Sequence, residues 1–253
     1  MGSSELALVA FACVFGGALL GLYLRVVLPE HHLSDESLDI VRLATGLVAT
    51  MAALVLGLLI SSSMGSFDRI NNELVENAAR VVSLDRLLAE YGPQTRELRE
   101  QIKRNYSTKV ELLTSGDATQ VAKLQTPESI GAMESIQAKL WRLAPRDDEQ
   151  RGLRSQALQI SSELGSARAL MLLQMDGSIP MRLLAVLVLW LVIIFIAFGL
   201  CAPRNYTTIG ALLVCSLCAS GAIFLILELD RPLDGFIKIP PAPLQAALAQ
   251  LGK

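Results

Sequence analysis

Four long stretches of the sequence contain no charged side chain. They are Leu6–Leu24, Leu43–Phe67, Leu183–Pro203 and Asn205–Leu227, with lengths of 19, 25, 21 and 23 residues. A hydrocarbon core about 30 Å thick requires about 20 helical residues at a rise of about 1.5 Å each. None of the stretches alternates apolar with polar positions, and backbone groups in lipid must be paired within the segment, so each is expected to be a helix. The pattern predicts an all-α protein with four transmembrane spans.

The segment between spans two and three is charged and shows a helical period. Its apolar residues form four stripes that begin at Phe67, Leu98, Ile130 and Leu153. Turn-forming residues separate the stripes at Gly92-Pro93, Ser115-Gly116-Asp117 and Ala144-Pro145. No such break lies between Phe67 and Leu88, so span two is expected to continue into this insert without interruption. We predict a helical bundle, with the alternative that one stripe faces a neighbouring subunit.

Composition supports an integral membrane protein. The chain of 253 residues is 52% hydrophobic and 18% charged, whereas soluble domains carry about 25% charged residues. The predicted division is spans one and two in residues 1–67, the helical insert in 68–181, spans three and four in 182–229, and a C-terminal tail in 230–253. An apolar face in the tail is expected to dock on the bundle or to lie in the lipid interface; it consists of Leu244, Ala247, Leu248 and Leu251.

The distribution of basic residues predicts the orientation. With four spans, both termini and the insert lie on one side of the membrane, and that side holds 19 of the 22 Lys and Arg residues. Arg69, Arg182 and Arg231 lie close to span ends, where the preference of basic residues for the cytoplasm is strongest. Both termini and the insert are therefore expected to be cytoplasmic.

Little in the sequence is typical of an enzyme or a nucleic-acid-binding protein. The net charge is −2, so the chain lacks the basic character that nucleic acid would require. Only two His and four Cys are present, and phosphate-binding, nucleophile-elbow and zinc-ligand spacings are missing. We expect no catalytic residues, no metal site, no cofactor and no nucleic-acid partner.

Small residues recur along span two. Gly46, Thr50, Ala53, Gly57 and Ser61 follow one another at spacings of four, three, four and four. Such a seam permits close helix packing, as does Gly17-x-x-x-Gly21 in span one. Alternatively, if span two faces the axis of a ring, the seam widens a pore and the neighbouring Leu side chains narrow it. The charges near the two ends of such a pore are Asp39, Arg42, Asp68 and Arg69.

Three short motifs resemble a known family of membrane proteins. Leu56-Gly57-Leu58 is followed by Gly65-Ser66-Phe67-Asp68-Arg69 and a long amphipathic helix, and this order is similar to the second-span region of bestrophin channels. The tail segment Leu227–Gly235 contains Leu-Asp-Arg-Pro and resembles the segment after the fourth bestrophin span. The closer resemblance is to a bacterial bestrophin-like family with four spans and a helical insert, and it covers nearly the whole chain.

The resemblance implies a homo-oligomeric ion channel in the bacterial inner membrane, with a pentamer favoured. Span two would surround a path for inorganic ions, with anions as the implied permeant species and membrane lipid around the ring. Positions that narrow the bestrophin pore correspond to Thr50, Leu54 and Leu58, with Gly46, Ala53, Gly57 and Ser61 also facing the pore. Tail acids bind calcium in animal bestrophins, which makes Glu228, Asp230 and Asp234 candidates here, paired helix-end charges being the alternative. A non-conducting scaffold or sensor that acts through its cytoplasmic helices is the alternative function.

Overall fold

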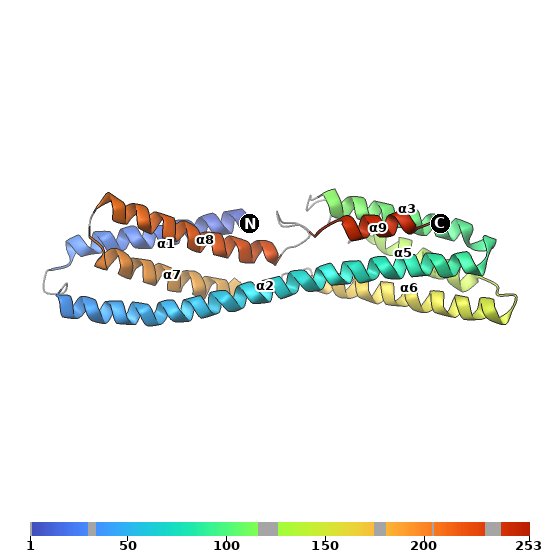
Figure 1. The fold of residues 1–253 in the computed structure, drawn as a ribbon, viewed down its shortest axis with the longest axis horizontal. Helices are drawn as coiled ribbons and strands as arrows, with labels where there is room; N and C mark the ends of the chain where they lie inside the picture. Colours follow the sequence, from blue (N-terminus) through green and yellow to red (C-terminus); the bar gives the residue numbers. More distant parts are fainter. Residues whose placement is uncertain (1, 30–33, 116–125, 175–180, 204, 231–238) are drawn as a thin grey trace. The chain divides into compact units, whose positions relative to one another are not determined.

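The computed structural model describes residues 2–29, 34–115, 126–174, 181–203, 205–230 and 239–253, and within these ranges every regular element is a helix (Figure 1). The elements are α1 (Ser3–Val27), α2 (Asp35–Tyr91), the 3₁₀ turn η2 (Pro93–Thr95), α3 (Arg96–Ser115), α5 (Pro127–Arg142), α6 (Asp148–Gln174), α7 (Met181–Cys201), α8 (Tyr206–Leu229) and α9 (Ala242–Gln250). The predicted all-α fold is confirmed.

Four of these helices, α1, α2, α7 and α8, are long and apolar enough to cross a membrane. They correspond to the four uncharged stretches, although α2 begins at Asp35 and so includes charged residues before Leu43. As predicted, α2 continues without a break beyond Phe67, and its 57 residues far exceed the roughly 20 that a bilayer requires. Asn205 begins α8, because its side-chain oxygen accepts a hydrogen bond from the Thr208 amide at 2.8 Å.

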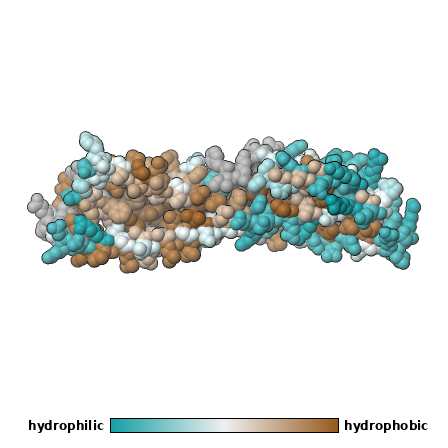
Figure 2. Space-filling model, viewed as in Figure 1, coloured by the Kyte–Doolittle hydropathy of each residue, from teal (hydrophilic) through white to brown (hydrophobic). Residues whose placement is uncertain are grey.

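The chain forms two compact units, the first made of residues 1–66 and 177–230 and the second of residues 67–176 and 231–253. The helix α2 contributes to both units. Hydrophobic residues dominate the visible surface of the first unit, whereas hydrophilic residues are frequent on the second (Figure 2). The first unit therefore presents a surface suited to lipid, and the second presents one suited to water.

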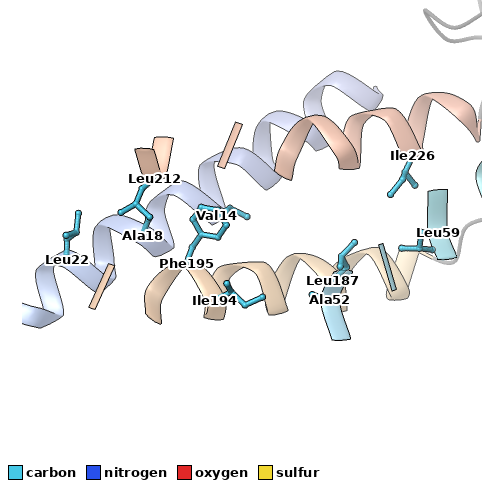
Figure 3. Close-up of a cluster of buried hydrophobic side chains, with 10 residues drawn as sticks. All are labelled: Val14, Ala18, Leu22, Ala52, Leu59, Leu187, Ile194, Phe195, Leu212 and Ile226. Atoms are coloured by element: carbon cyan, nitrogen blue, oxygen red, sulfur yellow. The ribbon is translucent and has the colours of Figure 1, made fainter. Parts of the chain in front are cut away.

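The core of the first unit is formed by side chains from α1, α2, α7 and α8 (Figure 3). Its buried members are Val14, Ala18, Leu22, Ala52, Leu59, Leu187, Ile194, Phe195, Leu212 and Ile226. Glycines bring α1 and α7 close together, since a Cβ added at Gly21 would overlap the Ile196 carbonyl and one at Gly199 would overlap the Ala18 carbonyl. The predicted packing role of the Gly17-x-x-x-Gly21 motif is thus confirmed.

The second unit is a bundle of the C-terminal part of α2 with α3, α5 and α6. One of its two buried clusters contains Leu84, Leu88, Leu98, Ile102, Ile136, Leu140, Ala157 and Leu164. The predicted break at Gly92-Pro93 is a tight turn in which Gly92 has a φ of 128°, a value that favours glycine, and the Thr95 hydroxyl donates to the Gly92 carbonyl at 2.8 Å. The break at Ala144-Pro145 lies between α5 and α6, and α3 ends at Ser115; residues 116 and 117 are outside the described ranges.

The tail helix α9 docks on the bundle of the second unit. Leu244, Ala247 and Leu251 are buried against a cluster that includes Ile70 and Tyr106. The first of the two predicted positions for this apolar face, on the bundle, is therefore confirmed.

Candidate functional site

The predicted pore residues lie on a face of α2 that points away from the core of the first unit. On the opposite face Ala52, Leu59 and Ser63 are buried, with exposed fractions of 3%, 7% and 0%. Successive helical residues are about 100° apart around the axis, so the predicted positions fall on the other half of the helix. All seven are exposed: Gly46, Thr50, Ala53, Leu54, Gly57, Leu58 and Ser61.

This face makes α2 the least covered of the four long apolar helices. Only 11% of its most apolar window is buried within the described chain, whereas the corresponding shares for the other three helices are 28–33%. Because α2 contributes so little surface to the core of the first unit, most of its apolar surface is available to contact lipid, to contact a second copy of the chain or to face a central axis.

The three residues predicted to narrow a pore follow one another at one-turn intervals. The side chains of Leu54 and Leu58 are strongly exposed, at 67% and 62%. The Thr50 hydroxyl donates its proton to the Leu47 carbonyl at 2.7 Å. The lone pairs of the hydroxyl oxygen are then available to accept a hydrogen bond from outside the helix. Repeated around a ring, these positions would form one polar and two apolar constrictions.

The glycines of α2 differ from those of α1 in their surroundings. A Cβ added at Gly46 or Gly57 meets no heavy atom of the described chain within 4 Å, whereas one at Gly17 lies 3.1 Å from the Val192 carbonyl. No helix of the described chain approaches the seam of small residues on α2. Close packing at that seam, and a pore lining alike, would therefore involve a molecule outside the described chain.

The charges near the ends of the apolar part of α2 are exposed. Asp39 and Arg42 form an ion pair of 2.7 Å one turn apart, with exposed fractions of 65% and 55%. An exposed pair of this kind contributes at most about 1 kcal/mol to stability. Asp68 and Arg69 are also exposed. All four side chains are thus accessible to ions in solution at the positions where the sequence places them.

Buried hydroxyls in the first unit were not singled out from the sequence. Ser63 donates to the Leu59 carbonyl at 2.9 Å, and Ser216 and Ser220 donate to carbonyls of the preceding turn at 2.8 and 3.0 Å. Ser216 and Ser220 lie four residues apart in α8, and this spacing of small residues was the signal that the sequence offered for them. Each of the two hydroxyls is paired to the backbone, so these small side chains serve close packing.

The tail acids do not form a cation site in the part of the chain that the structure describes. Glu228 is 3% exposed, Asp230 follows the end of α8, and Asp234 lies outside the described residues. Among the described residues, no three His, Cys, Asp or Glu side chains come together as metal ligands would.

A buried carboxylate that the sequence analysis missed joins the tail to the helices of the bundle. Asp85 is 2% exposed and accepts hydrogen bonds from Arg99 Nε at 2.9 Å, from Arg99 Nη2 at 2.8 Å and from the Gly252 amide at 2.9 Å. Burial raises the pKa of Asp85, but the hydrogen bonds from Arg99 and Gly252 and the charges of Arg99 and Lys103 outweigh burial, so the pKa is lowered. We refer to Asp85, Arg99 and Gly252 as the tail latch.

Known structures share this fold. A crystal structure of a bacterial bestrophin homologue from Klebsiella pneumoniae, in two single-residue variants, matches with TM-scores of 0.61 and 0.56 at 16% sequence identity. Each match covers 94% of this chain and 97% of the other. No protein with curated annotation matches the sequence significantly.

The family assignment comes from the sequence itself. The model of the bestrophin-like domain matches residues 12–244, which is most of the chain. The match includes the exposed face of α2, the helical insert and the beginning of α9. Together with the apolar helices, it identifies a membrane protein of channel-like architecture. The chain belongs to the bestrophin-like family.

Proposed function

We propose that copies of the chain assemble into a ring, with a pentamer favoured, and form an ion channel whose path is lined by α2. The observation that carries this proposal is the exposed face of α2, on which all seven predicted pore residues lie opposite the buried Ala52, Leu59 and Ser63. A ring accounts for this face, because the axis and the neighbouring copies would cover surface that the protomer leaves open.

The barrier to ions in this channel is apolar. Between Leu43 and Phe67 the helix carries no charged side chain, so no fixed charge is available to select ions by attraction. Leu54 and Leu58 would exclude water from the narrowest part, while Thr50 supplies hydroxyl oxygens one turn away. Inorganic ions are the proposed substrates, and anions are favoured because the chain resembles bestrophin channels.

The channel is proposed to lie in the bacterial inner membrane with the helical insert and both termini in the cytoplasm. The excess of Lys and Arg on the side of the insert supports this orientation. Accessibility of single cysteines introduced into α3 and α9, in a background in which the four native cysteines are replaced, would test it in intact cells.

The channel is tested by ion flux through the purified full chain in proteoliposomes. Leu54→Ala and Leu58→Ala each remove apolar volume from the proposed constriction and should raise flux several-fold over the wild type. Leu217→Ala is the matched control, because Leu217 on α8 is 58% exposed and is not placed at the axis. Opposite chloride and sodium gradients in the same vesicles measure ion preference.

The result that would overturn the channel is unchanged flux in both variants while the oligomer stays intact. That outcome would favour the alternative, a non-conducting scaffold or sensor, in which α2 is packed shut against its copies. Particle symmetry in the same samples measures the number of subunits independently of flux.

A further inference from the structure

Contacts between α1, α7 and α8 bring two exposed tyrosines to one end of the first unit (Figure 1). Gly21 of α1 lies against α7 there, since a Cβ added to it would be 3.0 Å from the Gly199 Cα. One turn further along α1, the Arg25 guanidinium donates to the Ala202 carbonyl, just after the end of α7. The helix α8 begins at Tyr206, only four residues later. We call this the tyrosine end of the first unit; it includes Tyr23 of α1.

The opposite end of the same three helices is marked by charged residues. Side chains from the start of α1, the start of α7 and the end of α8 pack there in one cluster, which contains Leu6, Ala10, Leu184, Ile223 and Leu227. Glu5, Arg182 and Glu228 each lie within two positions of a member of this cluster. We call this the charged end.

The distance between the two ends matches the thickness of a bilayer core. At about 1.5 Å per residue, α1 rises about 27 Å from Glu5 to Tyr23, and α8 rises about 33 Å from Tyr206 to Glu228. A hydrocarbon core is about 30 Å thick. If one boundary of that core lies at the charged end, the other boundary therefore lies at the two tyrosines.

Both tyrosines are exposed beside apolar surface. Tyr23 is 62% exposed and Tyr206 is 94% exposed. Toward the charged end, exposed apolar side chains follow on the same two helices: Leu19, Leu20, Ile209, Leu213 and Val214. A tyrosine has an apolar ring and a polar hydroxyl, so it suits the layer in which lipid headgroups meet hydrocarbon.

We propose that Tyr23 and Tyr206 bind the phospholipid headgroup layer of the leaflet farther from the helical insert, with their rings at the hydrocarbon boundary and their hydroxyls donating to ester or phosphate oxygens. The chain enters α7 from the insert at the charged end, so the tyrosine end belongs to the other leaflet. Phospholipid is a better partner than a second copy of the chain, because a bilayer boundary requires rings on separate helices to share one level and a protein contact does not.

Tryptophan fluorescence of the purified full chain in phosphatidylcholine vesicles tests the depth of each ring. The native Trp141 and Trp190 are first replaced by Phe, and Tyr23→Trp or Tyr206→Trp is then introduced singly. The vesicles contain phosphatidylcholine brominated either close to the headgroup or close to the end of the acyl chain. Each introduced tryptophan should be quenched at least twofold more strongly by the shallow bromine than by the deep one.

Two matched proteins calibrate the measurement. Leu217→Trp in the same background places the probe at a 58% exposed position of α8, about 16 Å along the helix from Tyr206, and it should be quenched more strongly by the deep bromine. Trp190→Phe alone keeps Trp141, which is 63% exposed in the second unit and should be quenched by neither lipid. If Tyr23→Trp does not fold, Tyr206→Trp carries the test by itself.

Binding is tested separately by adding phospholipid to the protein in detergent and recording the melting temperature. Replacing both Tyr23 and Tyr206 with Ala should raise the half-saturating phospholipid concentration several-fold, and replacing both with Trp should restore it.

Three results would overturn the proposal. They are deep quenching at position 206 that equals or exceeds shallow quenching, no quenching there by either lipid, or a half-saturating phospholipid concentration that is unchanged in the double Ala variant. The second result would mean that water or a second copy of the chain surrounds the ring. None of these readouts depends on a ring of subunits or on ion flux, so this inference and the proposed channel can fail independently.

Discussion

Removing Asp85 should weaken the docking of the C-terminal helix α9 on the bundle formed by α2, α3, α5 and α6. The carboxylate is 2% exposed and receives two hydrogen bonds from Arg99 and one from the Gly252 amide. Asp85→Ala leaves the Arg99 guanidinium and the Gly252 amide without this acceptor. Apolar contacts of Leu244, Ala247 and Leu251 with the bundle would remain, so α9 should open more often without unfolding the whole unit.

The expected size of the effect follows from the one Asp85 contact that reaches the tail, because Arg99 belongs to α3 and keeps its place in the bundle when α9 opens. A hydrogen bond to a charged group contributes about 1.5–3 kcal/mol. Since about 1.4 kcal/mol corresponds to a factor of ten in an equilibrium constant, loss of this contact should raise the open population of α9 roughly 10- to 100-fold.

Hydrogen exchange of α9 in the purified full chain measures this population. Arg86→Ala is the matched control, because Arg86 contacts the same helix through one exposed hydrogen bond of 3.2 Å to Gln250 Oε1. Loss of that contact should cost less than about 1 kcal/mol, a change of at most about fivefold in exchange rate. Exchange in Asp85→Ala within that same fivefold limit would refute the latch.

The latch should also weaken in acid. The pKa of Asp85 is lowered from its ordinary 3.8 in the folded protein, so the folded state binds this proton less readily than the unfolded state. The stabilisation is therefore complete above about pH 4 and is lost as the pH falls through the folded pKa. Protection of α9 that stays constant below pH 4, in protein whose bundle remains folded, would contradict this assignment.

Two further predictions concern helix packing and Lys109, which is partly buried. Gly21→Ala places a Cβ against the Ile196 carbonyl and 3.0 Å from the Gly199 Cα, whereas Gly16→Ala meets no heavy atom within 4 Å. Overpacking costs about 1–3 kcal/mol, so in a detergent unfolding titration Gly21→Ala should have the lower midpoint; equal midpoints would argue against the α1–α7 contact. Because the pKa of Lys109 is lowered from 10.5 to about 8, the unfolded state binds more protons between these values, and stability should rise across that range by at most about 3 kcal/mol. The melting temperature of Lys109→Met in halide-free buffer should lack this rise between about pH 8 and about pH 10. Burial raises the pKa of Tyr106 to about 12, so both proteins should become less stable above pH 10. Parallel melting-temperature profiles of the two proteins below pH 10 would contradict the burial of the Lys109 ammonium.

Helix positions could be predicted because their signals are local. The absence of charge over about 20 residues is sufficient for a membrane helix, and Gly92-Pro93 and Ala144-Pro145 interrupt the backbone wherever the chain lies in space. The continuation of α2 beyond Phe67 followed from the lack of any such break. The apolar face of α9 was visible as well, although its docking partner was not.

The position of the candidate pore face was predicted only as one of two alternatives. Gly17 and Gly21 in α1 have the same spacing of small residues as Gly57 and Ser61 in α2, yet only the α1 motif meets another helix in the described chain. Spacing shows which residues share a face of a helix, but it does not show what lies opposite that face. The sequence therefore could not separate close packing from a surface left open to other copies.

The sequence by itself determined the helices, their apolar or polar character and the family, because these depend on residues close together in the chain or on motifs read in order. Only the tertiary structure decided which side of α2 is buried, that Asp85 meets Gly252 across 167 positions, and that Asn105, Tyr106 and Lys109 share a cavity with residues of three other helices. Such contacts depend on how separate helices pack, and the free energy that selects one packing is spread over many side chains distant in sequence.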